Sequence, residues 1–503
     1  MATNIPRTLK SAQQLLRQGQ IRVSDIIDQA YSNIQSKSHL NAFVNVQDKQ
    51  KHAQQIEESQ KRYSEGKQLS DIDGLPIAIK HTFIFQGFTP NIDATVIRKL
   101  KQNGAIIVGK TNMDEFGMGS LGMYGYNDKK ITRNPIDEEY IAGGSSSGSA
   151  VATKSGYSLG TDTGGSVSYP AHCCGLYSMK PSYGRLSRFG QILYSSSNDV
   201  IGPMTNSSDD LESLFDIMQG EDSNDSNCIN FSNISKIRHQ DRLTKNPENI
   251  SLQNLRVGIV QEFDIAELDN RNRTIQDNLK SILKDQGAQL INVQIPLIKY
   301  ALPFYFTLVP AEASSNLSRY DGIKYGYQIP IGSQANTSAK QDLFDYIERV
   351  RSEAFGINVK RRVLLGNFLL SSRFEDYNEK VIESQRVRRL LIQQYCKVME
   401  ENQLDIIISP VSIGIEPPKI NDILNDNKGA QKNPVFEYKM DYFTALPNCL
   451  GIPAITMPVQ ECKTYKFPSS FMIQGYFGED YHLLKIAKEL DSLLRINKLN
   501  VEI

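Results

Sequence analysis

Two serines and one lysine stand where they could support nucleophilic catalysis. Residues 143–166 read GGSSSGSAVATKSGYSLGTDTGGS, a run of small residues in which Gly-Gly-Ser triplets end at Ser145 and Ser166. Lys80 ends the apolar segment GLPIAIK, well before the first triplet. A serine hydroxyl is a poor nucleophile until a neighbouring base takes its proton, and a neutral lysine is one such base. These residue types therefore indicate chemistry at an activated serine.

Lys80 can act as that base only if it loses its charge. A lysine ordinarily titrates near 10.4, and a general base works best near the operating pH, so its pKa must fall to about 7–8. That shift corresponds to roughly 3–5 kcal/mol against the ammonium form. The end of an apolar strand can impose this cost by removing the amine from water.

Other motifs compete for the glycine-serine run. Residues 144–148 satisfy G-x-S-x-G, which would make Ser146 the nucleophile of an α/β-hydrolase with His172, His239 or His482 as its base. The preceding NPIDEEYIAG is a poor buried strand, which disfavours this interpretation. A phosphate-binding loop has the pattern G-x-x-x-x-G-K-[ST], and the run lacks the lysine that follows the second glycine of that pattern.

The segments around these residues alternate between short β-rich runs and helical patterns. Strands are predicted at 75–80, 104–110, 255–262, 404–410 and 453–459, and helices at 93–102, 273–286, 340–355, 383–401 and 480–495. This alternation favours an α/β layered architecture. With no internal repeat and no clean linker, we expect one domain over 1–503, with a polar surface insertion at about 205–252.

Composition narrows the possible functions. The chain has 56 basic and 56 acidic residues, so nucleic acid is expected to be held by a partner. Its six cysteines form no metal-ligand spacing, which predicts a reduced intracellular protein without structural zinc. The best candidate membrane segment, residues 405–415, is short and broken by Pro410, so no membrane association is expected.

The N-terminus supports two interpretations. It carries four basic residues and no acidic residue before Asp25, a pattern weakly like a mitochondrial transit peptide. The same segment shows helical periodicity, a break at Gly19 and a capping Ser24, which are typical of folded protein.

The larger set of motifs resembles the amidase signature family. The matching segments are GLPIAIK, GKTNMDEFGMGS (109–120), GGSSSGSA (143–150), LGTDTGGS (159–166), GLYSMKPSYGRLSRFG (175–190), IGPMT (201–205), EASSNLSRYDGIKYGY (312–327) and VKRRVLLGNFLLSS (359–372). Within that family the chain looks most like the A subunits of glutamyl-tRNA(Gln) amidotransferases, particularly the mitochondrial form. The resemblance implies a mixed central β-sheet covered by helices on both faces, with the signature core at about 72–205.

The resemblance also assigns roles to the catalytic residues. Lys80 and Ser145 would relay the proton, with Ser145 joined to Gly144 through a cis peptide, and Ser166 would form the acyl ester. The backbone amides of residues 163–166, namely Thr163, Gly164, Gly165 and Ser166, would form the oxyanion hole.

Three later residues would recognise glutamine. They are Tyr305, Arg362 and Asp441, where the arginine would hold the α-carboxylate and the aspartate the α-ammonium. No metal site is expected in this chain.

The implied reaction is the hydrolysis of glutamine to supply ammonia. The B and C subunits would be the partners that complete a heterotrimer, which amidates Glu-tRNA(Gln) bound mainly by the B subunit. ATP with Mg²⁺ would activate the glutamate on a partner, so this chain should bind no cofactor. A mitochondrial matrix location is expected, with the cytoplasm as the alternative. The other functions considered are a stand-alone amide hydrolase of the same family and a catalytically impaired scaffold subunit.

Overall fold

A central mixed sheet forms the framework of this computed structural model. The structure describes residues 6–81, 92–125, 130–231, 250–324, 326–329, 343–371, 377–425, 434–459 and 466–497. Eleven strands within these residues follow the order β1-β3-β2-β4-β6-β5-β10-β11-β9-β7-β8. The strands are β1 (Phe43–Val46), β2 (Pro76–Lys80), β3 (Ile106–Thr111), β4 (Tyr157–Asp162), β5 (Tyr177–Lys180), β6 (Val200–Thr205), β7 (Arg256–Val260), β8 (Gln289–Val293), β9 (Ile406–Pro410), β10 (Ala454–Val459) and β11 (Ser469–Gln474).

Strand directions place several chain ends at one edge of the sheet. β2 runs parallel to both of its neighbours, β3 and β4. β6 is antiparallel to β4, so the start of β6 lies beside the end of β4, with Val200 opposite Asp162. The ends of β2, β3 and β4 and the beginning of β6 therefore meet at the same edge.

The C-terminal strands join the two halves of the sheet. β10 pairs antiparallel with β5, and β11 pairs antiparallel with β9. β10 and β11 pair with each other over six residues. The strands from the first half of the chain and those from β7 to β9 thus become one sheet only through residues 454–474.

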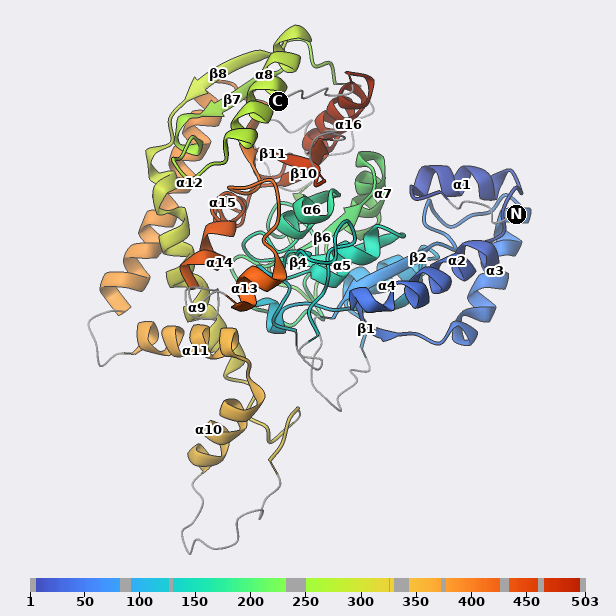
Figure 1. Cartoon of the computed structure of the whole chain (residues 1–503), viewed down its shortest axis with the longest axis horizontal. Coiled ribbons are helices and arrows are strands. Elements are labelled where there is room, and N and C mark those ends of the chain that lie inside the picture. Colours follow the sequence, from blue (N-terminus) through green and yellow to red (C-terminus); the bar gives the residue numbers. More distant parts are fainter. Residues whose placement is uncertain are drawn as a thin grey trace, which may run out of the picture.

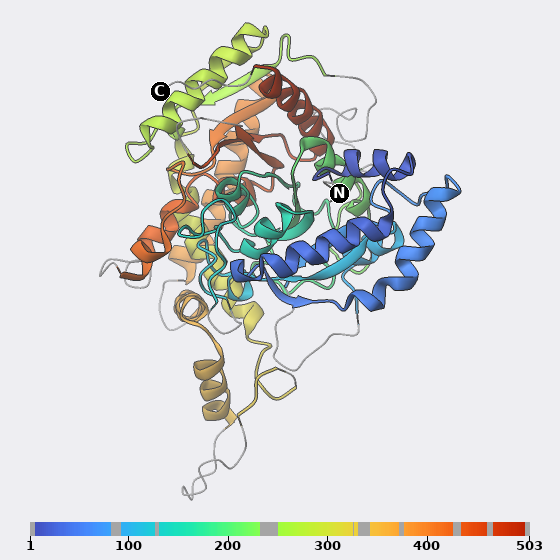
Figure 2. The same ribbon diagram turned by 45° about the vertical axis from the view of Figure 1, so that its right-hand side comes forward.

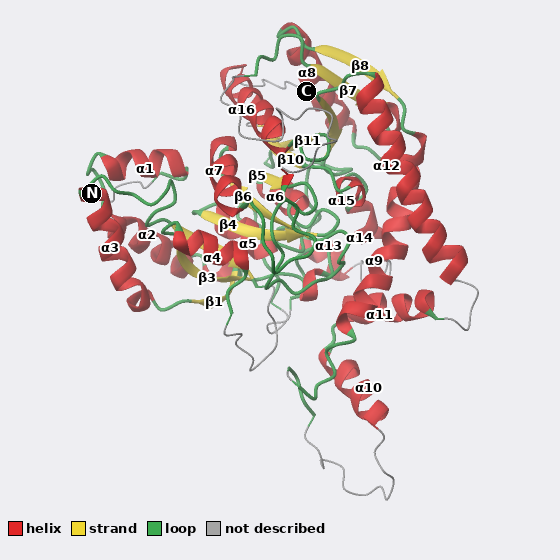
Figure 3. Cartoon of the chain, turned by 180° about the vertical axis from the view of Figure 1, so that it is seen from behind, coloured by secondary structure: helices red, strands yellow, loops and turns green. Residues whose placement is uncertain are grey.

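Helices surround the strands, as Figure 3 shows from behind. They are α1 (Leu9–Arg17), α2 (Val23–Ser36), α3 (Ala53–Ser64), α4 (Thr95–Gln102), α5 (Ser147–Thr153), α6 (Ser168–Cys174), α7 (Ser208–Met218), α8 (Asn270–Asp285), α9 (Ala301–Leu317), α10 (Leu343–Ala354), α11 (Ile357–Leu370), α12 (Glu383–Glu401), α13 (Ile420–Asn425), α14 (Pro434–Met440), α15 (Ala445–Leu450) and α16 (Asp480–Asn497).

Apolar side chains fill both faces of the sheet. Along β9, Ile406 and Ile408 belong to the core that includes α4, α7, α8 and α16. Ile407, which points the opposite way, belongs to a second core with α9, α12 and α15. The expected α/β architecture, a mixed sheet with helices on both faces, is confirmed.

Most predicted elements are present, with one addition and one correction. The run 143–166 contains a complete strand, β4, after the helix α5, so its serine turns are joined by a helix and a strand. The predicted polar insertion at 205–252 is wrong for its first part. α7 lies there and buries Leu211, Leu214 and Phe215 in the core, because its apolar residues share one helix face. Residues 232–249 of that stretch lie outside the described part.

Candidate active site

Lys80 and Ser145 lie in direct contact below the protein surface. Lys80 is the last residue of β2 and is only 4% exposed, and Ser145 is fully buried. The Lys80 Nζ donates a hydrogen bond to Ser145 Oγ at 2.7 Å and another to the Thr161 carbonyl at 3.2 Å. The lysine and serine expected to exchange a proton are therefore within hydrogen-bond reach.

Burial brings the lysine into the range that a general base requires. The pKa of Lys80 falls to about 7, because removal from water disfavours the ammonium more than the nearby carboxylates favour it. Those carboxylates are Asp162, Asp114 and Asp199. Close to neutral pH, a large fraction of the Lys80 side chain is thus uncharged and able to accept a proton.

The sheet edge explains why three carboxylates surround one lysine. Asp162 ends β4, Asp199 directly precedes β6, and Asp114 follows β3, so all three lie where β2 delivers Lys80. All three side chains are fully buried. None of these aspartates was predicted as a site residue, although two lie inside the motifs that carry the family resemblance.

Hydrogen bonds fix two of these carboxylates. Asp114 accepts from the backbone amides of Gly122 and Tyr124, both at 2.9 Å. Asp199 accepts from the Thr163 hydroxyl at 2.6 Å. Burial raises the pKa of each carboxyl to about 6, against the opposing effect of these donors.

The first serine turn has the backbone geometry that the resemblance implies. The Gly144–Ser145 peptide is cis. α5 begins immediately afterwards, and the Ser146 hydroxyl donates to the Thr161 carbonyl at 3.2 Å. Ser146 is fully buried and follows no strand, so the nucleophile-elbow alternative is wrong. Of its candidate bases, His172 contacts the Gly414 carbonyl, His482 lies beside Asp405, and His239 is outside the described residues.

The second serine turn is held by Asp162. This carboxylate accepts from the backbone amides of Gly165 and Val167, both at 2.6 Å, and of Ser168 at 3.2 Å. The turn bears Ser166, which is half-buried, between β4 and α6. The Ser166 carbonyl accepts from the Ser146 amide at 3.2 Å, so the two serine turns are in contact. Within the described chain, no hydrogen bond joins the Ser145 and Ser166 hydroxyls.

The backbone amides of this turn differ in whether they already have a hydrogen-bond acceptor. Gly165 already donates to Asp162, so its predicted part in an oxyanion hole is not supported. In the part of the chain that the structure describes, the amides of Thr163, Gly164 and Ser166 have no acceptor. Three of the four predicted donors can therefore face a developing negative charge.

Close packing explains the two glycines of the turn. A Cβ on Gly164 would lie 2.3 Å from the Tyr305 hydroxyl oxygen. A Cβ on Gly165, whose φ is +125°, would lie 2.0 Å from the Thr444 hydroxyl oxygen. Only glycine leaves room here, and Tyr305 is thereby placed against the serine turn.

The remaining predicted substrate residues lie close by, on separate elements. Arg362 in α11 is 6% exposed and donates from Nε to the Tyr194 hydroxyl at 2.8 Å. No described residue accepts from its Nη2 atom. Asp441, at the end of α14, accepts from the Ser120 hydroxyl at 2.7 Å. Burial raises the pKa of Asp441 well above its usual value, and the Arg362 charge opposes that rise.

Sequence reasoning missed several residues that position this group. Ser120 donates its backbone amide to Glu437 at 2.8 Å, in addition to its bond with Asp441. Tyr194 orients Arg362, and Thr444 donates to the Gly164 carbonyl at 3.0 Å. Ser120 lies in the motif at 109–120, but no local motif marks Tyr194 or Thr444. All four bonds join residues more than a hundred positions apart, so spacing alone does not reveal them.

A narrow cavity adjoins the serine turns. Its lining includes His81, Phe116, Thr161, Thr163 and Tyr194. Burial lowers the pKa of His81 to about 4, so this histidine is neutral at physiological pH. The cavity reaches Thr163, one of the residues with a free amide, and Tyr194, the partner of Arg362.

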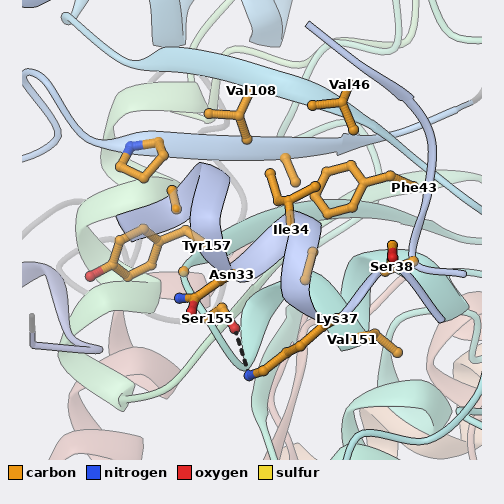
Figure 4. A pocket seen from close by; sticks show the side chains of 16 residues that line it. Asn33, Ile34, Lys37, Ser38, Phe43, Val46, Val108, Val151, Ser155 and Tyr157 are labelled. Carbon is orange, nitrogen blue, oxygen red and sulfur yellow. Dashed lines mark hydrogen bonds between the residues drawn. The ribbon is translucent and has the colours of Figure 1, made fainter. Parts of the chain in front are cut away.

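A second cavity lies near the other end of the strands (Figure 4). It occupies about 160 Å³ between α2, β1 and the start of β4, and most of its lining is apolar. Lys37 donates to Ser155 at its rim, at 3.3 Å. This cavity contains none of the predicted catalytic or substrate residues.

The described residues also bear on two other features, a metal site and a membrane span. They contain no group of three or more His, Cys, Asp and Glu residues arranged to hold a metal ion. In the same residues, no helix is both long and apolar enough to span a membrane.

Comparison with known proteins gives consistent matches. The sequence pattern of the amidase family matches residues 25–484. The A subunit of glutamyl-tRNA(Gln) amidotransferase from Sulfurisphaera tokodaii is 34% identical, with 98% of this chain and 99% of the relative covered. The protein of the same name from Fusobacterium nucleatum is 33% identical, with 98% and 97% covered.

Solved structures agree with the sequence matches. The crystal structure of the A subunit of glutamyl-tRNA(Gln) amidotransferase from Thermotoga maritima aligns with a TM-score of 0.66 at 28% identity, covering 95% of this chain and 91% of that one. A crystal structure described as an amidase aligns with a TM-score of 0.75 at 24% identity, covering 96% and 99%, and supports the fold.

Proposed function

This chain belongs to the amidase family, and we propose that it is the glutamine-hydrolysing A subunit of a glutamyl-tRNA(Gln) amidotransferase. The observation that carries the proposal is the buried Lys80–Ser145 hydrogen bond beside the half-buried Ser166. The near full-length relatives with that name support the choice of substrate.

Hydrolysis begins with attack by Ser166 on the carboxamide carbon of glutamine. Ser145 takes the Ser166 proton and passes its own to neutral Lys80, while the carbonyl oxygen becomes an oxyanion facing the free amides of Thr163, Gly164 and Ser166. Collapse of this intermediate breaks the carbon–nitrogen bond, and the proton returns through the serines to the leaving nitrogen as ammonia. Water then attacks the glutamyl ester, releases glutamate and restores the Ser166 hydroxyl.

Glutamine is held by charge at its other end. The Nη2 atom of Arg362, which has no acceptor among the described residues, binds the α-carboxylate, and Asp441 binds the α-ammonium. Tyr305 packs on Gly164 and so lies against the serine turn. A simple amide without both charges would leave a buried cation or carboxylate unpaired, which favours glutamine over other amides.

The released ammonia serves a second reaction on a partner. The B and C subunits complete the enzyme, ATP with Mg²⁺ activates the glutamate of Glu-tRNA(Gln) on the B subunit, and ammonia converts it to Gln-tRNA(Gln). The zero net charge of this chain supports tRNA binding by the partner. A mitochondrial matrix location is also proposed, on the resemblance to the mitochondrial form. The N-terminal segment itself forms α1 and buries Leu9, Ala12 and Leu16 in the core, as the folded interpretation of this segment predicts.

Reconstitution tests this proposal. The full chain is co-expressed with the B and C subunits from its own source, and glutamine-dependent formation of Gln-tRNA(Gln) is measured. We expect Ser166→Ala to abolish activity with glutamine but to retain activity with ammonium chloride, because the amidation site is intact. Full glutamine-dependent activity in Ser166→Ala would overturn the mechanism. Turnover of simple amides without turnover of glutamine would instead identify a stand-alone amide hydrolase.

A further inference from the structure

Apolar side chains form a row on the outward face of α11. The row consists of Ile357, Leu364, Leu365 and Phe368, which are 48%, 69%, 39% and 43% exposed, and we call these four residues the α11 stripe. Single exposed apolar residues are ordinary, but a contiguous group of large ones is characteristic of interaction surfaces.

Helical spacing makes the stripe one continuous surface. Positions 357, 364, 365 and 368 fall on one side of a helix with 3.6 residues per turn. The opposite side buries Val359, Arg362 and Gly366 against α9. A Cβ on Gly366 would lie 2.1 Å from the Pro310 carbonyl oxygen, so α11 is pressed onto α9 and its outward face is fixed.

α10 extends this surface away from the body of the chain. Its Leu343 and Phe344 are 55% and 75% exposed. Figures 1 and 2 show α10 standing clear of the sheet and its covering helices, with α11 between it and the body. A stable interface commonly buries about 800 Å² on each partner, more than four side chains provide, and α10 supplies additional area.

α11, which carries the stripe, is basic, whereas α10 carries both signs, with Asp345, Glu348 and Glu353 beside Arg349 and Arg351. α11 contains no acidic residue and includes Lys360 and Arg361 beside the buried Arg362. The Lys380 ammonium lies 5.3 Å from the centre of the Phe368 ring. A complementary partner would present apolar side chains bordered by carboxylates.

We infer that the α11 stripe and the exposed end of α10 are a docking surface for another subunit of the amidotransferase. The inference rests on the proposed function, which supplies the partner, and it specifies an apolar segment flanked by Asp or Glu. Arg362 projects from the other side of the same helix toward the substrate residues. The docking surface and the arginine expected to bind the α-carboxylate therefore lie on opposite sides of one helix.

Leu364→Glu in the full chain tests the surface. The variant places a carboxylate at the most exposed position of the stripe. The matched control is Leu69→Glu, because Leu69 is 51% exposed near the start of β2. Each chain is co-expressed with tagged B and C subunits, and complex formation is measured by co-purification and by light scattering on a sizing column.

We expect Leu364→Glu to weaken association at least tenfold and Leu69→Glu to leave it unchanged, with both free chains melting within a few degrees of the wild type. A double variant, Leu364→Ser and Leu365→Ser, removes the apolar contacts without adding charge and should weaken association in the same direction. The docking surface would be overturned if Leu364→Glu associated as strongly as the wild type, or if Leu364→Glu and Leu69→Glu lost association equally. Either result would leave the glutamine-dependent activity of the wild-type complex intact. Absence of that activity in an assembled wild-type complex would instead contradict the proposed function.

Discussion

The pH dependence of glutamine hydrolysis should report the titration of Lys80. This side chain is only 4% exposed, and burial outweighs three neighbouring carboxylates to bring its pKa to about 7. Because the neutral amine accepts the proton, kcat should rise with pH through that value and then become constant. The perturbation is pH alone, so no side chain is replaced, although Asp114 and Asp199, with pKa values of about 6, also titrate at the acid end of the range.

The expected change is large enough to measure. With a pKa near 7, about half of the lysine is neutral at pH 7, about one tenth at pH 6 and about nine tenths at pH 8. The rate should therefore fall close to tenfold for each pH unit below about 6.5 and change by less than about 10% above pH 8.5. A lysine with the ordinary value near 10.4 would instead give a roughly tenfold rise per unit across pH 7 to 9.

Ammonia release at saturating glutamine is the appropriate assay, since kcat then excludes changes in substrate binding. It should be followed in the assembled complex from about pH 5.5 to 9.5, with Ser166→Ala as the background. A rate that stays flat below pH 7, or that climbs tenfold per unit above pH 8, refutes the assignment of Lys80 as a buried base.

Four further outcomes are expected. Gly165→Ala should abolish ammonia release and lower the melting temperature, because its Cβ would lie 2.0 Å from the Thr444 hydroxyl oxygen at a φ of +125°. Arg362→Lys should raise the KM for glutamine about tenfold or more with a smaller effect on kcat, because an ammonium cannot reproduce the fork that binds a carboxylate. The KM should also rise as pH falls, because burial raises the pKa of Asp441 and protonation removes the charge that binds the α-ammonium. Lys80→Met should be inactive but more stable to urea at pH 6 by about 1–4 kcal/mol, a gain that shrinks toward pH 10. The reason is that a depressed lysine pKa stabilises the fold only at high pH and loses that contribution as pH falls from about 10.4 through 7.

The serine turns and the lysine strand could be predicted because their signals are local. Glycine next to serine, and an apolar run ending in lysine, are readable within a few residues, and β2 matches the expected strand. The Gly144–Ser145 cis peptide was expected from the family resemblance alone, and the structure has it. β4 was missed inside 143–166 because YSLGTD carries little apolar alternation. Its strand state comes from pairing with β2 and β6.

The carboxylates around Lys80 could not be derived from spacing. Asp114, Asp162 and Asp199 come together only because parallel and antiparallel strands end at one edge of the sheet. The same limit applies to Ser120 and Asp441, which are 321 positions apart in the chain. In the structure the Ser120 hydroxyl oxygen lies 2.7 Å from a carboxylate oxygen of Asp441. Such pairs follow from topology, which local patterns do not encode.

The order of the strands also governs when this chain can become an enzyme during its synthesis. β5 and β9 are joined only by β10 and β11, so until residue 474 is made the nascent chain holds two part-sheets, each with an open edge. Open edges of this kind pair readily with other chains. A ribosome that stops early therefore releases an aggregation-prone fragment. Thr444, which packs on the serine turn, also emerges late, so glutamine hydrolysis begins only after nearly all of the protein has been translated.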